Sequence, residues 1–196
     1  MIRLGLTGSI ATGKSTVLAA FADLGIPVFS ADAAVHQLYR SRAVEPVEQL
    51  FPGVSREGTI DRAALSRVLV AHPDRLPELE AVVHPLVREE MHRFLDHAEA
   101  SGAALAVIDI PLLFESGYDY GLDAVAVTIV PDEVLRHRAL ARPGMSVEKL
   151  DTILARQLPQ EEKRKRADYL LDTSGSVEQA RMHVEKLVQT LRAGAG

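Results

Sequence analysis

The sequence predicts an α/β protein in which helices flank a five-stranded parallel sheet. Two observations lead to this fold class. Short apolar runs alternate with helical patterns along the chain, which is typical of buried parallel strands. One of these runs leads through a glycine-containing loop directly into a helical pattern. The strand candidates are residues 2–7, 26–29, 104–109, 124–130 and 168–172.

The loop after the first strand candidate carries a phosphate-binding pattern. Residues 8–15 read Gly-Ser-Ile-Ala-Thr-Gly-Lys-Ser and match G-x-x-x-x-G-K-[ST] at every fixed position. Gly8 and Gly13 permit backbone angles that a side chain forbids, so the backbone N–H groups can form an anion-binding nest. Lys14 adds a cation for the β- and γ-phosphates, and Ser15 offers a hydroxyl to Mg²⁺.

The elements on both sides of this loop have the order that phosphate binding requires. The apolar run 2–7 precedes the loop, and the helix that follows has one apolar face and stops at Gly25. This face consists of Val17, Leu18, Phe21 and Leu24. The context favours a nucleotide-phosphate site over a strand-to-helix turn without a ligand.

Length and composition restrict the possible functions. The 196 residues are enough for one core and a small additional lobe, and the net charge of −5 argues against nucleic acid as the main partner. No apolar run is long enough to span a membrane and no signal peptide is recognisable, so we expect no membrane partner and a cytoplasmic location. The absence of cysteine excludes disulfides and thiol chemistry, and the absence of asparagine excludes the Asn-Lys-x-Asp signature of many GTPases.

The long interval between the second and third strand candidates predicts a helical lobe. Asp61 is expected to cap a helix over 62–70, and another helix begins near Asp74 and runs toward Ala100. The predicted division is a core of about 1–30, 103–130 and 167–196, a lobe of about 31–102, and a lid of about 131–166.

The last helical pattern predicts a packing helix. Ser176 and Gln179 form a capping-box pattern, and an apolar stripe begins at Val177 and recurs at helical spacing. We assign no chemistry to this helix. The tail 193–196 is expected to be frayed.

The charged run 161–166 looks like a basic patch but has a simpler interpretation. Glu161 with Lys165, and Glu162 with Arg166, have the spacing of favourable i,i+4 pairs on a helix. We therefore expect a solvated helix face that pairs its own charges.

Acidic residues follow the second and third strand candidates, at the sheet edge where ligands bind in parallel α/β proteins. Asp32 either caps the next helix or accepts the proton of a kinase's acceptor hydroxyl. Asp109 either supports Mg²⁺ or is an ordinary residue at a strand end. Pro111 then directs the chain away from the sheet. Leu112 and Phe114, with Leu113 between them, belong either to the core or to an apolar wall for a substrate.

Two basic clusters lie outside the phosphate loop. His84-Pro85 is expected to break a helix, because proline removes a helical hydrogen bond, and Arg88 follows about one turn later. This pair is either surface or a site for a phosphate or hydroxyl. Arg138 and Arg142 are four residues apart on a predicted helix. They form either a solvated face or a lid that brings charge to a transferring phosphate. Gln157, at the end of the next predicted helix, could face the same site.

Together these motifs resemble the dephospho-coenzyme A kinase family of the phosphate-loop kinase superfamily. The resemblance covers nearly the whole chain in order, and it implies a P-loop NTPase-type five-stranded core with a helical substrate lobe and a short lid. Besides the loop, the matching pieces are Ala31-Asp32, Ile60-Asp61-Arg62, Leu79 to Arg88, Pro111-Leu-Leu-Phe-Glu115, Arg138 with Arg142, Gln157, and Ala167-Asp-Tyr169.

The resemblance implies ATP-dependent phosphorylation of the ribose 3′-hydroxyl of dephospho-CoA, the last step of coenzyme A synthesis, with ATP and Mg²⁺. It implies that Asp32 is the catalytic base, that Lys14 binds phosphate and that Arg142 acts from the lid. On the ATP side, the site residues are Gly8, Ala11, Thr12, Gly13, Lys14, Ser15, Thr16, Arg138, Arg142 and Thr173. On the substrate side they are Asp32, His84, Arg88, Pro111, Leu112 and Phe114, and the Mg²⁺ residues are Ser15 and Asp109.

Thr173 departs from the frequent Asp-Asn of the family, because a hydroxyl lacks the paired donor and acceptor of an amide. Two other functions stay open. Another P-loop kinase, of nucleoside monophosphate or gluconate type, would share the loop but not the 31–102 lobe. A non-catalytic regulator would bind nucleotide without acceptor-dependent turnover. No obligate protein partner is predicted.

Overall fold

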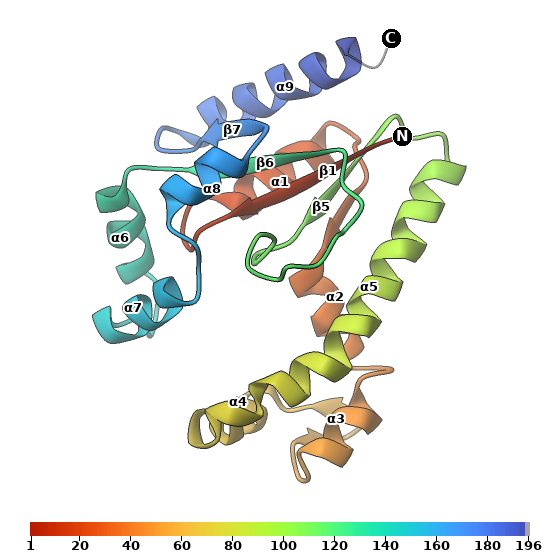
Figure 1. Cartoon of the computed structure of the whole chain (residues 1–196), viewed down its shortest axis with the longest axis vertical. Coiled ribbons are helices and arrows are strands. Elements are labelled where there is room, and N and C mark those ends of the chain that lie inside the picture. Colours follow the sequence, from red (N-terminus) through yellow and green to blue (C-terminus); the bar gives the residue numbers. More distant parts are fainter. Residues whose placement is uncertain (195–196) are drawn as a thin grey trace. The chain divides into compact units, whose positions relative to one another are not determined.

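The computed structural model describes residues 1–194 of the chain (Figure 1). The chain forms two compact units, each with its own core. Unit 1 consists of Met1–Val28 and Ala98–Gly196, and unit 2 consists of Phe29–His97. Of the tail predicted to be frayed, Ala193 is the last residue of a helix, and residues 195–196 lie outside the described part. Within residues 1–194, no helix is long and apolar enough to cross a membrane.

The central sheet has five strands in the order β2-β5-β1-β6-β7. The strands β1 and β5 are parallel, as are β1 and β6, and β6 and β7. Each predicted strand overlaps an observed one, so the predicted five-stranded parallel sheet is confirmed. The strands are β1 (Ile2–Gly8), β2 (Val28–Ser30), β5 (Leu105–Asp109), β6 (Ala124–Ile129) and β7 (Tyr169–Asp172).

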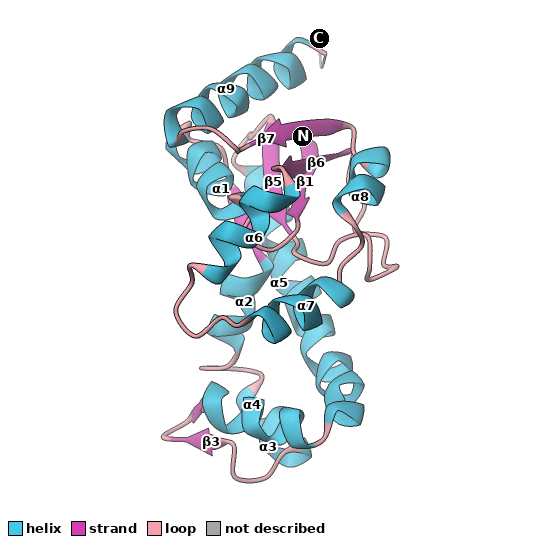
Figure 2. Cartoon of the chain, turned by 90° about the vertical axis from the view of Figure 1, so that its left-hand side faces the viewer, coloured by secondary structure: helices cyan, strands magenta, loops and turns pink. Residues whose placement is uncertain are grey.

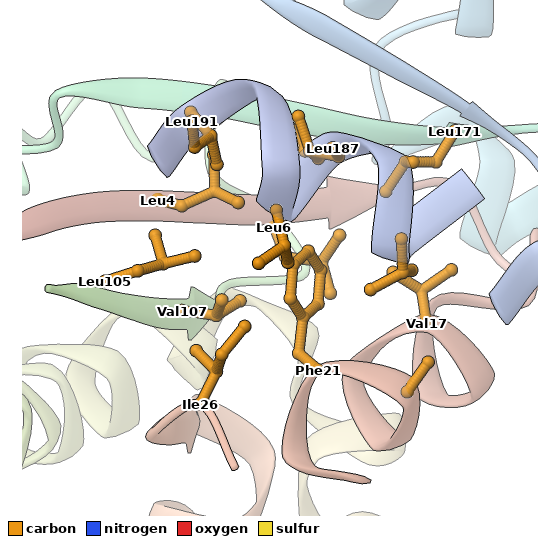
Figure 3. Close-up of a cluster of buried hydrophobic side chains, with 14 residues drawn as sticks. Leu4, Leu6, Val17, Phe21, Ile26, Leu105, Val107, Leu171, Leu187 and Leu191 are labelled. Carbon is orange, nitrogen blue, oxygen red and sulfur yellow. The ribbon is translucent and has the colours of Figure 1, made fainter. Parts of the chain in front are cut away.

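Helices cover the sheet of unit 1 on both sides (Figure 2). On one side, α1 (Lys14–Asp23) and α9 (Val177–Ala193) pack against each other and against the strands. Alternate residues of a strand point to the same face, so Leu4 and Leu6 of β1 both face this layer. There they meet Phe21 of α1 and Leu187 of α9 (Figure 3). On the other side, α8 (Gln160–Arg166) packs on β6 (Figure 2).

The ends of α1 and α9 only partly match the predictions. The capping box is confirmed, since Ser176 Oγ accepts from Gln179 N and Gln179 Oε1 accepts from Ser176 N. Two predicted apolar-face positions are wrong. Val177 is 51% exposed because it is the first residue of α9 and lines a pocket, and Leu24 is 39% exposed because it lies beyond the last turn of α1.

The region between β6 and β7 is helical and rests on the phosphate loop. Its first two helices, α6 (Asp132–Leu140) and α7 (Val147–Ala155), pack on each other. Ala139 of α6 and Leu150 of α7 form an apolar cluster with Ala11 of the loop. The loop is thus part of the core of unit 1.

The charged run 161–166 in α8 is the predicted solvated face except at one residue. Lys163 is fully buried and pairs with Glu115. Glu162 pairs with Lys165, three residues away, rather than with Arg166 as predicted. The pattern of charges did not reveal that one residue of this face points into the protein.

Unit 2 is built from helices and one small hairpin. Its core includes Leu38, Val47, Phe51, Leu65 and Val83. The hairpin of β3 (Ser55–Arg56) and β4 (Thr59–Ile60) was not predicted, and its strands have only two residues each. The helices are α2 (Ala31–Leu38), α3 (Val44–Leu50), α4 (Arg62–Ala71) and α5 (Leu76–Ala100), with a 3₁₀ turn η1 (Pro73–Arg75) before α5.

Two sequence predictions in unit 2 have different outcomes. Asp61 caps α4 as predicted, because its Oδ1 accepts from Ala63 N at 2.9 Å and from Ala64 N at 3.0 Å. The predicted break at His84-Pro85 is wrong, since α5 continues through Pro85. A proline removes one hydrogen bond from a helix, but the buried packing of this helix, with Val83 in the core, outweighs that loss.

Candidate active site

The phosphate loop connects the end of β1 to the start of α1. Gly13 has a φ of 75°, in the left-handed region that favours glycine. Gly8 does not have a positive φ, so the predicted reason for this glycine is wrong. It is required for space, because a Cβ at this position would overlap Thr128 Oγ1. Ala11 also has a left-handed φ, of 62°, at a position the pattern leaves variable.

Hydrogen bonds from buried threonines hold this loop in place. Thr12 Oγ1 donates to Ser9 O at 2.8 Å and lies 2.7 Å from Thr128 Oγ1 on β6. Thr173 Oγ1 donates to Thr12 O at 2.7 Å. Both Thr12 and Thr173 are almost fully buried. The hydroxyl of Thr173 is therefore used to hold the loop, although the residue also lines the pocket described below.

Lys14 forms an ion pair with Asp109, which is the last residue of β5. Asp109 is buried, and the register places it opposite Leu6 on β1, close to the start of the loop. A buried carboxylate that pairs with the loop lysine is not an ordinary strand-end residue. Ser15 lies next to Lys14 in the first turn of α1 and is exposed.

A pocket of about 290 Å³ in unit 1 brings loop residues and arginines together. Arg138 and Arg142 both line it, and Arg138 Nη2 donates to Ser174 O at 3.3 Å. Arg138 lies on α6 as predicted, whereas Arg142 lies past the helix, which ends at Leu140. The other lining residues are Ala11, Gly13, Ser15, Thr16, Thr173, Gly175, Ser176, Val177 and Ala180.

The far wall of this pocket, from Gly175 to Ala180, was not predicted. It is the turn after β7 and the start of α9, so the capping box was a signal for it that the sequence analysis used only for packing. Asp172 fixes this turn, because its Oδ1 accepts from Ser174 N at 2.8 Å. The hydrogen bonds from Ser174 lower the pKa of Asp172, and the nearby His183 and Arg164 lower it further. The turn is thus held by a carboxylate that stays ionised at neutral pH.

The segment after β5 contains three apolar residues that were expected to lie either in the core or in an apolar wall for a substrate. The structure gives them different environments. Leu113 is buried and belongs to the core, whereas Leu112 is 40% exposed. Phe114 is half-buried, with the Arg166 guanidinium 5.9 Å from its ring centroid. Pro111 O accepts from Thr7 Oγ1 at 3.2 Å, which ties the start of the segment to β1. Only Leu112 and Phe114 offer apolar surface to a ligand.

The remaining predicted site residues lie in unit 2. Ser30 is the N-cap of α2, with its side chain accepting from Ala33 N, so the interpretation of Asp32 as the cap is wrong. Asp32 is the second residue of α2 and is exposed. His84 and Arg88 lie one turn apart on α5, where His84 is exposed and Arg88 half-buried.

Of three polar residues near the loop, Gln157 was predicted to face the site, whereas Glu115 and Lys163 had no predicted role. Gln157 Oε1 accepts from Ile10 N of the phosphate loop at 3.0 Å. Glu115 Oε1 accepts from Leu158 N at 2.7 Å, and Lys163 pairs with Glu115. Glu115 and Gln157 are pieces of the family resemblance, and an acidic residue in an apolar segment was a usable signal. No signal in the sequence marked Lys163, because this residue lies in a run of charged residues.

The fold and this site define a phosphate-loop kinase. A parallel sheet, a glycine loop with a paired lysine, and a pocket lined by two arginines are the parts that bind and stabilise a transferring phosphate. Solved structures of other such kinases share the fold. A shikimate kinase from Bacteroides thetaiotaomicron is 20% identical with a TM-score of 0.55, and covers 97% of this chain and 98% of its own.

The chain belongs to the dephospho-CoA kinase family, whose family model matches residues 2–179. The dephospho-CoA kinase of Rhizobium meliloti (strain 1021) is 51% identical over 194 residues, which cover 99% of this chain and 100% of that protein. That of Brucella melitensis biotype 1 is 50% identical over 191 residues, covering 97% and 96%. A dephospho-CoA kinase structure from Campylobacter jejuni is 27% identical with a TM-score of 0.69, covering 96% of each chain. The family resemblance seen in the sequence is therefore confirmed.

Proposed function

We propose that this chain transfers the γ-phosphate of ATP to the 3′-hydroxyl of the ribose of dephospho-CoA, giving coenzyme A and ADP. One observation carries the donor half of this proposal. Within unit 1, Gly13 and Ser15, the two neighbours of Lys14 in the phosphate loop, line the same pocket as Arg138 and Arg142. Membership of the dephospho-CoA kinase family supports the acceptor half.

On the ATP side, the proposal assigns the phosphates to the loop and the start of α1. The backbone N–H groups after Gly13 point out of the helix N-terminus, where its dipole favours an anion. Lys14 binds the β- and γ-phosphates, exchanging part of its interaction with Asp109 for them. Arg142 and Arg138 stabilise the charge on the transferring phosphoryl group. The rest of the pocket, including Thr173, accommodates the nucleoside.

We further propose that Mg²⁺ binds beside the phosphates, held by the Ser15 hydroxyl and the Asp109 carboxylate. These are the hard oxygen donors that Mg²⁺ prefers, and this ion keeps several waters, so a small protein contribution suffices. When bound, the ion neutralises charge on the phosphate oxygens. The contact of Lys14 with Asp109 supports this assignment, because it places a carboxylate next to the phosphate-binding group.

On the acceptor side, we propose that Asp32 is the general base. It accepts the proton of the 3′-hydroxyl while that oxygen bonds to the γ-phosphorus and the bond to the β–γ bridging oxygen breaks, which releases ADP. Asp32 lies in the first turn of α2 and is exposed, so its carboxylate is accessible to an acceptor hydroxyl. His84 and Arg88 bind polar groups of the acceptor, and Leu112 and Phe114 contact its apolar parts.

The test is an ADP-release assay with a panel of acceptors. We expect rapid turnover with dephospho-CoA, and none above the rate without acceptor for nucleoside monophosphates, gluconate or shikimate. Phosphorylation of one of these compounds, with none of dephospho-CoA, would identify a different phosphate-loop kinase. Nucleotide binding without turnover for any acceptor would identify a regulator. A cytoplasmic location stays a prediction, which cell fractionation can check.

A further inference from the structure

Unit 1 contains a buried ion pair that the proposed chemistry does not use. The side chain of Lys163 on α8 is 0% exposed and that of Glu115 is 13% exposed, with Nζ 2.9 Å from Oε1. Among residues 1–194, neither Lys163 Nζ nor Glu115 Oε2 has a hydrogen-bond partner, so the contact is an ion pair without hydrogen-bond geometry. Removing two charges from water costs about as much as their attraction returns, which makes such a pair a poor source of stability. Its position suggests another role.

Glu115 holds the junction between α7 and α8. The same oxygen that faces Lys163 accepts from Leu158 N at 2.7 Å. Gln160 fixes the same junction to the end of β6, donating to Val130 O at 3.1 Å and accepting from Val130 N at 3.3 Å. We call residues 157–163 the α7–α8 junction. Its backbone position is thus set by contacts with the sheet and with the segment after β5.

The first residue of this junction reaches the phosphate loop. Gln157 Oε1 accepts from Ile10 N at 3.0 Å, between Gly8 and Gly13. Leu158, which Glu115 holds, is the next residue in the chain, so a shift of Leu158 moves the backbone that carries the Gln157 side chain. A contact chain therefore runs from Lys163 and Glu115 through Leu158 and Gln157 to the loop.

The other end of this contact chain is the segment proposed to contact the acceptor. Glu115 directly follows Phe114, and Arg166 of α8 lies 5.9 Å from the Phe114 ring centroid. The α7–α8 junction thus touches both the segment after β5 and the loop for the ATP phosphates. It is one of the places in unit 1 where those two parts are connected, beside the contacts of Lys14 with Asp109 and of Thr7 with Pro111.

We propose that Glu115 is a positioning residue. Its ion pair with Lys163 fixes the α7–α8 junction, and through Gln157 this holds the phosphate-loop backbone at Ile10 in the geometry that binds ATP. The inference rests on the proposed function only where an assay uses dephospho-CoA as the acceptor. It concerns ATP binding, which calorimetry measures without an acceptor.

The first test is a double-mutant cycle on Glu115→Gln and Gln157→Ala. Glu115→Gln keeps the shape and an acceptor for Leu158 N but removes the charge that faces Lys163. We expect each variant to weaken ATP binding about tenfold, the scale on which orienting partners act. Because both act on the same loop contact, the double variant should lose no more than the worse single variant. Losses that multiply would mean independent effects and would overturn the proposal.

A second variant covers the case in which Glu115→Gln does not fold because it leaves Lys163 buried without its counter-charge. Glu115→Gln with Lys163→Met removes both charges and keeps an acceptor for Leu158 N, so stability should be preserved. We expect a melting temperature close to that of the wild type together with ATP binding about tenfold weaker. A stable double variant that binds ATP normally would show that the pair only packs.

The exposed pair on the same helix provides the matched control. Glu162→Gln with Lys165→Met removes an ion pair of 2.7 Å whose side chains are 43% and 60% exposed, and it should leave the ATP affinity unchanged. Weaker ATP binding in this control would also overturn the proposal, since any charge change on α8 would then have the effect. If the wild type binds ATP but does not phosphorylate dephospho-CoA, the proposed function fails and the cycle can still be read.

Discussion

The two units of the molecule differ in how their functional residues are encoded. Unit 1 places most of the residues proposed to bind phosphate in one strand–loop–helix segment, residues 2–23, and the parallel sheet fixes that segment on both sides. Unit 2 has no such segment. Asp32 lies on α2, whereas His84 and Arg88 lie on α5, far along the chain. A donor site can therefore be recognised from a short motif, while an acceptor site depends on how separate helices pack.

The largest effect is expected for Asp32→Asn in unit 2. The amide cannot accept the acceptor's proton, so turnover should fall by about 10²–10⁴-fold, while ATP affinity stays near normal. Steady-state ADP release and calorimetry with ATP measure the two quantities. Asp96→Asn, an exposed residue of α5, is the matched control and should leave both unchanged. Full turnover in Asp32→Asn would place the base elsewhere and remove the acceptor role of α2.

Lys14→Ala tests the corresponding residue of unit 1. Loss of a cation that stabilises the transferring phosphate should lower turnover by about 10²–10³-fold even at saturating ATP. Lys186→Ala, on the exposed side of α9, is the control. An unchanged maximal rate in Lys14→Ala would contradict phosphate-loop chemistry. Comparing Lys14→Ala with Asp32→Asn distinguishes the contributions of unit 1 and unit 2, since only Lys14→Ala should also weaken ATP binding.

A smaller effect is expected for Thr173→Val, which keeps the shape but removes the hydroxyl that donates to Thr12 O. A buried acceptor left without its donor costs about 1–3 kcal/mol, so the urea midpoint should fall and ATP binding should weaken. Thr190→Val serves as the control, because its hydroxyl makes only an exposed bond within α9. Equal effects in the two variants would show that Thr173 does not brace the loop.

The smallest effect concerns the pH dependence of Asp61 in unit 2. The N–H of Ala64, followed by that of Ala63, lowers the pKa of this carboxyl below its usual 3.8. A lowered pKa stabilises the fold at any pH above 3.8, and this contribution is lost as the pH falls through the folded-state pKa. Asp61→Asn should therefore be less stable than the wild type at pH 7, and the difference should vanish in strong acid. A difference in unfolding free energy that is independent of pH would contradict the cap.

The difference between the units also explains what the sequence could predict. The strands of the central sheet, the phosphate loop and the Asp61 cap depend on neighbours in the chain, and the sequence predicted all of them. The burial of Lys163 depends on Glu115, which lies outside its helix, so no local pattern marks it. The same holds for Gly8, whose requirement comes from Thr128 on β6. For Pro85, the packing of α5 outweighed a local preference for a break.

The candidate site was predicted unevenly for the same reason. Both arginines and four of the named loop residues line the pocket, namely Ala11, Gly13, Ser15 and Thr16. Its wall at Gly175–Ala180 was not predicted, and Gln157 was expected to face the site without its partner Ile10 being named, because the wall and this contact are each created where distant segments meet. For Ser30 and Asp32, in contrast, a local pattern was present but allowed two interpretations. Either residue type can cap a helix, and only the backbone geometry shows that Ser30 does so.

The left-handed backbone at Ala11 links the conformation of the phosphate loop to the packing of α6 and α7 on it. An alanine at a φ of 62° gives up about 1–2 kcal/mol relative to ordinary backbone, and its contacts with Ala139 and Leu150 offset that cost. The packing of α6 and α7 therefore stabilises the loop in this backbone conformation. By thermodynamic linkage, a ligand that binds this conformation of the loop would in turn stabilise the packing of the two helices on it.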